Sequence, residues 1–156
     1  MFKVKDFVVY AGHGVCNVKR IETKTIADKR KDFYVLQLLS NQMALIVPTD
    51  STLLRSLINS KELDSIKAIL RTQFKVEDTT WNKRYKRYME LIKTGNPLYV
   101  ARVVSSLHTL KGQKDLSFGE RKMLDHAIQL LSNEIQYAFD VPEESAMNLI
   151  LNELSA

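Results

Sequence analysis

Residues 33–52 read FYVLQLLSNQMALIVPTDST, and this stretch decides the fold. Aromatic and aliphatic residues dominate positions 33–39, apolar residues fill positions 43–47, and a polar turn lies between them. This pattern predicts two neighbouring strands of a sheet. The second run ends at Pro48, which has no backbone N–H to donate to a sheet. We therefore expect the sheet to end near residue 50.

The residues before this stretch predict further strands of the same sheet. Apolar and turn-forming segments alternate there: Phe7–Tyr10, the turn Gly12-His13-Gly14, Val15–Ile21, the Thr-rich Glu22–Ile26 and the polar hairpin loop Ala27–Asp32. Several short strands separated by turn signals are typical of a small β-barrel or a curled sheet. Residues 1–53 are therefore predicted to form a β-domain.

After about Thr52 the apolar spacing changes from that of a strand to that of a helix. Cap signals divide the rest of the chain into four or five helices. These signals are Ser60, a helix from Asp78 or Thr79 to Gly95, Asn96-Pro97 before a helix to about Gly112, the capping box Ser117-Phe118-Gly119-Glu120, and Pro142-Glu143-Glu144. The predicted fold class is α+β with two domains, in which an all-helical domain, residues 54–156, follows the β-domain.

Basic residues are unevenly distributed along the chain. It carries 23 Lys and Arg against 18 Asp and Glu, and the last basic residue is Lys122. The residues after Lys122 include Asp and Glu but no Lys or Arg. A basic body with an acidic end indicates an anionic partner such as nucleic acid. The alternative interpretation is a solvated surface on which charge is unevenly spread.

Signals for secretion, disulfides and membrane insertion are missing from the sequence. No apolar segment follows the N-terminus, and no run approaches the roughly 18 apolar residues of a membrane span. A single cysteine, Cys16, excludes an internal disulfide. We expect a cytoplasmic protein that does not associate with membranes.

Catalytic and metal-binding patterns are missing as well. His13, His108 and His126 are not in metal-ligand spacing with Cys16. The chain has five glycines and no glycine-rich phosphate loop before a helix. Cys16 falls within a predicted strand, where a small core residue is expected rather than a reactive thiol. We predict no catalytic residue, no metal and no cofactor.

The segment TTWNKRYKRY, residues 79–88, interleaves basic and aromatic residues. At about 100° per residue, one broad helix face carries Lys83, Arg84, Lys86 and Arg87. The opposite stripe carries Trp81, Tyr85, Tyr88, Met89 and Ile92. In one interpretation this stripe is core and the basic face is solvated. In the other, the basic face contacts phosphates, and Trp81 projects from the first helical turn to stack on a base or enter the minor groove.

Together these segments resemble the CarD/CdnL family of bacterial RNA polymerase-binding regulators. The resemblance covers essentially the whole chain and rests on Phe7–Tyr10, His13-Gly14-Val15, Ile21–Thr25, Trp81 with Lys83–Lys86, Leu116-Ser117 and Gly119–Leu124. It implies a Tudor-like β-barrel that docks on the β-subunit of RNA polymerase. It also implies a helical domain that contacts promoter DNA, largely independently of sequence, at the upstream edge of the transcription bubble and stabilises the open complex.

The resemblance also assigns roles to individual residues. The implied DNA contacts are Trp81 as a wedge, Lys83 and Lys86 at phosphates, Arg84 and Arg87 as helpers, and Arg121 and Lys122 at a second basic spot. The implied polymerase-facing residues are Thr23, Lys24, Thr25, Ile26, Ile46, Val47 and Pro48. Two positions depart from the family pattern, because Ile46 stands where some relatives carry arginine and Ala11 replaces a proline.

Three classes of function remain open at this point. The first is a promoter regulator, monomeric in solution and held at the nucleoid through RNA polymerase. The second is an adaptor whose barrel binds another protein or an RNA. The third is an enzyme, which would need a deep pocket with convergent titratable groups that the sequence does not indicate.

Overall fold

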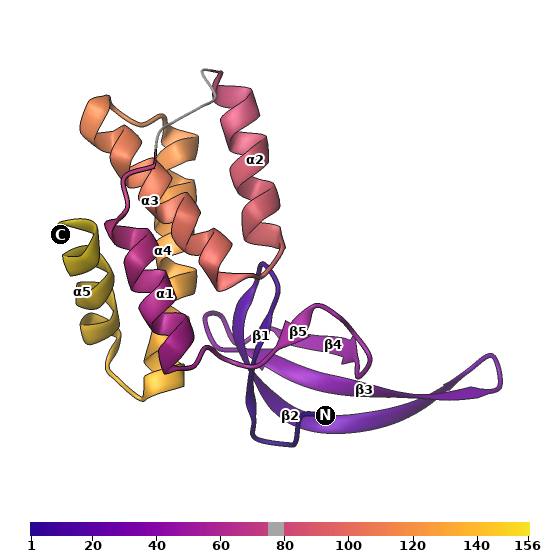
Figure 1. Cartoon of the computed structure of the whole chain (residues 1–156). Coiled ribbons are helices and arrows are strands. Elements are labelled where there is room, and N and C mark those ends of the chain that lie inside the picture. Colours follow the sequence, from indigo (N-terminus) through magenta and orange to yellow (C-terminus); the bar gives the residue numbers. More distant parts are fainter. Residues whose placement is uncertain (75–79) are drawn as a thin grey trace. The chain divides into compact units, whose positions relative to one another are not determined.

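Five antiparallel strands form the N-terminal unit of the protein, Met1–Leu57. The computed structural model describes residues 1–74 and 80–156. The strands are β1 (Phe7–Tyr10), β2 (Gly14–Ile26), β3 (Lys29–Leu38), β4 (Ala44–Pro48) and β5 (Leu54–Arg55). They form one sheet in the order β4-β3-β2-β1-β5 (Figure 1). The predicted β-domain at the start of the chain is confirmed.

The hairpin between β2 and β3 is longer than the sequence analysis predicts. Pairing continues to Ile26 opposite Lys29, so only Ala27 and Asp28 form the turn. Both turn residues have positive φ angles, 49° and 63°, as a two-residue type I′ turn requires. The predicted loop Ala27–Asp32 is wrong in length, because this tight turn matches the twist of the strands and allows the polar residues after it to pair.

Alternate side chains along the strands build the core of this unit. Val8, Cys16, Tyr34 and Leu36 belong to one buried cluster. Cys16 is 0% exposed, and burial raises the pKa of its thiol to about 11. The thiol is therefore protonated and shielded at neutral pH, and its prediction as a core residue is confirmed.

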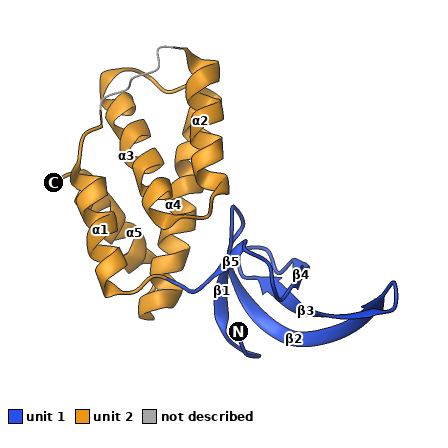
Figure 2. Ribbon diagram, turned by 45° about the vertical axis from the view of Figure 1, so that its right-hand side comes forward, with its two compact units in different colours: residues 1–57 blue, residues 58–156 orange. Residues whose placement is uncertain are grey.

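The sheet extends past the boundary that we expected between residues 53 and 54. The short strand β5 pairs with β1, with Arg55 opposite Val9 and Leu54 opposite Tyr10. The chain divides into its two units after Leu57 (Figure 2). A strand of two residues is too short to produce a periodic pattern of apolar residues. The sequence therefore contains no sign of β5, and the predicted boundary was placed at the turn residues after Pro48.

Five helices lie in the described part of the C-terminal unit, Ile58–Ala156. They are α1 (Ser60–Arg71), α2 (Trp81–Lys93), α3 (Pro97–Gln113), α4 (Phe118–Phe139) and α5 (Glu143–Leu154). They share one buried cluster, which includes Val104 and Leu107 of α3 and Ile135 of α4. The predicted helical domain is confirmed. The predicted start of the second helix, at Asp78 or Thr79, lies outside the described residues.

Side-chain caps explain where two of these helices begin. The Ser117 side chain accepts the backbone N–H of Glu120, and the Glu120 side chain returns a bond to Ser117, as the capping box predicts. The expected cap at Ser60 is wrong by one residue. Asn59 is the cap of α1, and it forms a second capping box with Glu62. Ser60 is therefore the first helical residue.

Candidate functional site

Trp81, the first residue of α2, lies on the surface of the helical unit. It is 42% exposed, and its ring stacks on that of Tyr85, with centroids 5.2 Å apart and an interplanar angle of 23°. Tyr88 and Ile92, further along the same helix, are buried instead. The sequence left two interpretations open, with Trp81 either in the core or projecting from the first helical turn. The geometry favours the projecting side chain.

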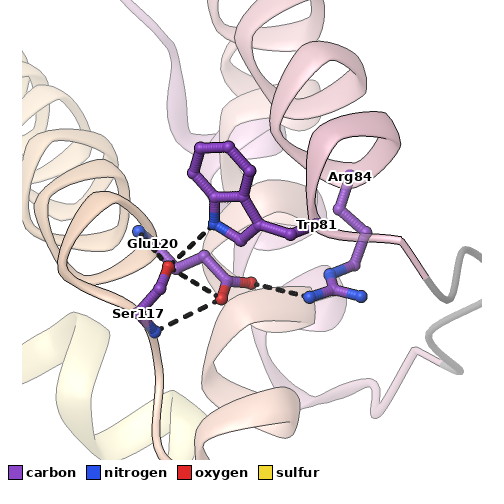
Figure 3. Close-up of polar contacts among 4 residues, drawn as sticks. All are labelled: Trp81, Arg84, Ser117 and Glu120. Carbon is purple, nitrogen blue, oxygen red and sulfur yellow. Dashed lines mark hydrogen bonds and ion pairs between the residues drawn. The ribbon is translucent and has the colours of Figure 1, made fainter.

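A hydrogen bond ties the indole of Trp81 to the N-terminus of α4 (Figure 3). The indole Nε1–H donates to Ser117 Oγ over 2.8 Å. That hydroxyl also accepts the backbone N–H of Glu120 and donates to Glu120 Oε1, 3.0 Å away. One hydroxyl supplies one donor and two acceptors, so this serine uses its full capacity both to cap α4 and to anchor Trp81.

Gly119 leaves the space that the indole occupies. A Cβ atom at this position would lie 3.2 Å from Cζ2 of Trp81 and 3.9 Å from Cε2 of Tyr85. The first of these distances is shorter than ordinary carbon–carbon contact. A side chain at position 119 would therefore require the indole ring to shift by a few tenths of an ångström.

Arg84 is buried, which corrects its predicted place on the exposed basic face. It is 5% exposed, and its Nη2 lies 3.4 Å from Oε2 of Glu120, which is also buried (Figure 3). Buried ions remain charged only where opposite charges and hydrogen bonds replace their lost hydration. Arg84 therefore joins α2 to α4 inside the unit, and the expectation that it helps to contact DNA is not supported.

The remaining basic residues predicted for DNA contact are exposed. They are Lys83, Lys86 and Arg87 on α2, and Arg121 and Lys122 on α4. The hydrogen bond from Trp81 to Ser117 brings the start of α2 to the start of α4. Two basic segments that lie far apart in the sequence are thereby placed in the same part of the helical unit.

Ser117→Ala is expected to release the indole from α4. Trp81 is the single tryptophan of the chain, so fluorescence excited selectively at tryptophan, and not at the six tyrosines, reports its environment alone. We expect red-shifted emission and lower anisotropy, with a loss of about 1 kcal/mol in the free energy of unfolding because the cap is lost. Ser117→Thr keeps a hydroxyl and should preserve the wild-type spectrum. Unchanged emission from the Ala variant would contradict the anchoring role of Ser117.

In the sequence, Ser117 and Glu120 are recognised as a capping box and as part of the family resemblance, and neither basis predicts a contact with another helix. Their contacts with Trp81 and Arg84 each span 36 residues. A capping box satisfies its local pattern without any partner from another helix, so no sequence signal indicates these contacts. Gly119, two positions after the cap residue, is the one residue of this segment whose small size is consistent with a close neighbour.

The β-domain carries the second predicted surface, and the sheet register divides its residues between two faces. Phe33 lies opposite Glu22 of β2 and Pro48 of β4. Residues opposite each other share a side of the sheet, and so do residues two positions apart in one strand. Lys24, two positions from Glu22, therefore lies on the same side as Ile46, two positions from Pro48. We call this side the outer face, formed by Lys24, Ile26, Phe33, Ile46 and Pro48. Ile46 is 54% exposed, and Lys24 Nζ lies 5.8 Å from the ring centroid of Phe33.

Three residues predicted to face polymerase do not point to the outer face. Val47 is buried in the core of the sheet, so its side chain cannot reach a partner. Thr23 and Thr25 project from the opposite side, where the Thr23 hydroxyl donates to Asp32 Oδ1 over 2.6 Å. A polymerase-facing surface would therefore use alternate residues of these strands and not the continuous segments that we expected.

Within residues 1–74 and 80–156, no three His, Cys, Asp or Glu side chains are grouped so that they could hold a metal ion. In the same part of the chain, no helix combines the length and apolar character that crossing a membrane would need.

Both units match domains of known families. Residues 2–58 match the CarD-like/TRCF RID domain, and residues 65–151 match the CarD C-terminal domain. The Bacillus subtilis (strain 168) protein named "Putative transcription factor YdeB" is 30% identical over 147 residues, which cover 92% of this chain and 96% of that protein. A β-domain and a helical domain with these relatives define a transcription regulator. The chain belongs to the CarD family.

Proposed function

We propose that the protein docks on the β-subunit of RNA polymerase through its β-domain and stabilises the open promoter complex through its helical domain. Membership in the CarD family supports the role in transcription. One observation carries the contact with DNA: an exposed indole, Trp81, is anchored between two exposed basic segments. An exposed aromatic ring beside basic residues can stack on the unpaired bases of melted DNA.

The basic residues and the indole contribute to different steps of this function. Lys83, Lys86 and Lys122 bind DNA phosphates and release counterions, which attracts any sequence and weakens as salt rises. The indole of Trp81 interacts more strongly with unstacked bases than with intact duplex. A binder shifts an equilibrium only through its differential affinity for the two states. The indole therefore favours the open complex, while the charges hold the protein on DNA.

The outer face of the sheet supplies the polymerase contact in this proposal. It combines exposed apolar side chains, including Ile46, with the charge of Lys24. Beyond Val18, β2 pairs with β3, and β1 lies opposite Gly14–Asn17 only. The far end of β2 thus offers a backbone edge to which a strand of the partner can add. Docking there raises the local concentration of the helical unit near the promoter.

Transcription with purified RNA polymerase tests the proposal directly. Open-complex lifetime and abortive product should be measured with and without the protein on several promoters. A longer lifetime supports the proposal. Unchanged lifetimes, together with failure to recover polymerase when the protein is used as bait, would instead favour an adaptor that binds another protein or an RNA.

Lys24→Glu is expected to weaken polymerase binding by about tenfold or more, because it reverses a charge at the edge of an interface. Folding and DNA binding should be unaffected, since Lys24 is exposed and lies in the other unit. Binding to the isolated lobe of the β-subunit can be measured by calorimetry. Arg30→Glu is a matched control, because Arg30 pairs with Thr25 and projects from the opposite side of the hairpin. Equal losses in both variants would argue against the outer face.

A further inference from the structure

Phe118, the first residue of α4, is an aromatic side chain left in water. It is 74% exposed, more than any other large hydrophobic residue described in the helical unit. At about 100° per residue, the buried Glu120 lies some 200° away around the helix, so Phe118 points away from the core. Its exposure therefore follows from the fold, and packing inside the unit does not explain the choice of phenylalanine.

The ammonium group of Lys122 lies over the ring of Phe118. Its Nζ lies 4.6 Å from the centroid of Phe118, one helical turn before it. A cation over an aromatic face is held by the quadrupole of the ring. The pair consequently presents a flat apolar surface and an ammonium group side by side, which is the combination that a base and its phosphate require.

The surface around Phe118 is continuous with the indole of Trp81. The preceding residue, Ser117, holds the indole N–H, and the following residue, Gly119, lies under the indole ring. Around α4, Lys122 lies about 40° from Phe118 and about 60° from Gly119, so it stands between the two aromatic side chains. Trp81, Lys122 and Phe118 thus form one strip across the start of α4.

We propose that Phe118 is a second base-stacking residue, which contacts an unpaired base on the strand that Trp81 engages while Lys122 contacts a neighbouring phosphate. This inference rests on the DNA contact of the proposed function and extends it from one aromatic residue to two. The occupant is single-stranded DNA beside a duplex, because exposed cations lie on both helices that form the strip: Arg121 and Lys122 on α4, and Lys83 and Lys86 on another face of α2 than Trp81. Asp125, two turns along α4, limits the strip at its other end.

The test uses the full-length protein and two fluorescent DNA probes, a duplex with a central unpaired bubble and the same duplex fully paired. At low ionic strength, Phe118→Ala and Phe118→Leu should each weaken bubble binding by about 5-fold or more and change duplex binding by less than about 2-fold. Phe118→Tyr keeps an aromatic ring and should bind the bubble as the wild type does. Leu151→Ala on α5 is the control, since Leu151 is also exposed but lies in the acidic end of the chain.

The outcomes separate this inference from the proposed function. Loss of bubble binding in Trp81→Ala but not in Phe118→Ala would overturn the role of Phe118 and leave the Trp81 wedge intact. No loss in either variant would overturn the base contacts proposed for both residues, and the basic residues alone would then account for binding to DNA. Equal losses on bubble and duplex, or equal losses in Phe118→Ala and Leu151→Ala, would show that Phe118 does not stack on unpaired bases. Because Phe118 is exposed, the melting temperature of each variant should remain that of the wild type.

Discussion

Trp81→Ala leaves the protein folded and able to bind RNA polymerase, and it removes most of the stabilisation of the open complex: this is the result that we expect. Polymerase binding is retained because the outer face lies in the other unit. Stacking of one aromatic residue on a base is worth about 1–3 kcal/mol. The contribution of the protein to open-complex lifetime should therefore fall by roughly 5- to 150-fold.

Thermal unfolding and open-complex lifetime should be measured on the same preparation of this variant. If Trp81 were a core residue, its loss would cost about 3–5 kcal/mol and melt the helical unit. The 42% exposure of Trp81 predicts a much smaller effect. A folded variant that still stabilises the open complex fully would remove Trp81 from the mechanism, whereas Trp81→Phe should retain part of the activity because it retains a ring.

Arg84→Glu is expected to destabilise the helical unit by at least about 3–5 kcal/mol, the cost of breaking a buried ion pair. The new carboxylate would face that of Glu120, which is buried at 3% exposure, with no water to screen the repulsion. The neighbouring change Lys83→Glu should leave the free energy of unfolding within about 0.5 kcal/mol of wild type, as for other surface substitutions.

Lys83→Glu is expected to act on DNA binding and not on folding. Lys83→Glu should weaken binding to every duplex and lower the salt dependence, because one phosphate contact is lost. Denaturant unfolding and a salt titration of DNA affinity check both expectations. If Arg84→Glu folded normally and only DNA binding fell, the buried pair would be wrong and Arg84 would return to the basic face.

Local patterns in the sequence were sufficient for the division into a β-domain and a helical domain. Period-two and helical spacing of apolar residues depend on near neighbours in the chain, and so does the capping box at Ser117 and Glu120. The basic and aromatic composition of residues 79–88 is likewise a local property. Weak local signals produced the errors, at the two-residue turn Ala27-Asp28 and at the short strand β5.

Which side chains of these helices are buried and which are exposed could be decided only from the tertiary structure. A helical wheel places Arg84 beside Lys83 and Lys86, and nothing in that segment indicates that Arg84 turns inward while Trp81 and Tyr85 remain at the surface. The deciding partners, Glu120 and Ser117, belong to another helix 36 residues away. A buried charge is tolerated only where an opposite charge meets it, and an indole holds one orientation only where an acceptor faces its N–H. Those conditions arise when the fold brings the start of α2 to the start of α4, and no spacing within either helix contains them.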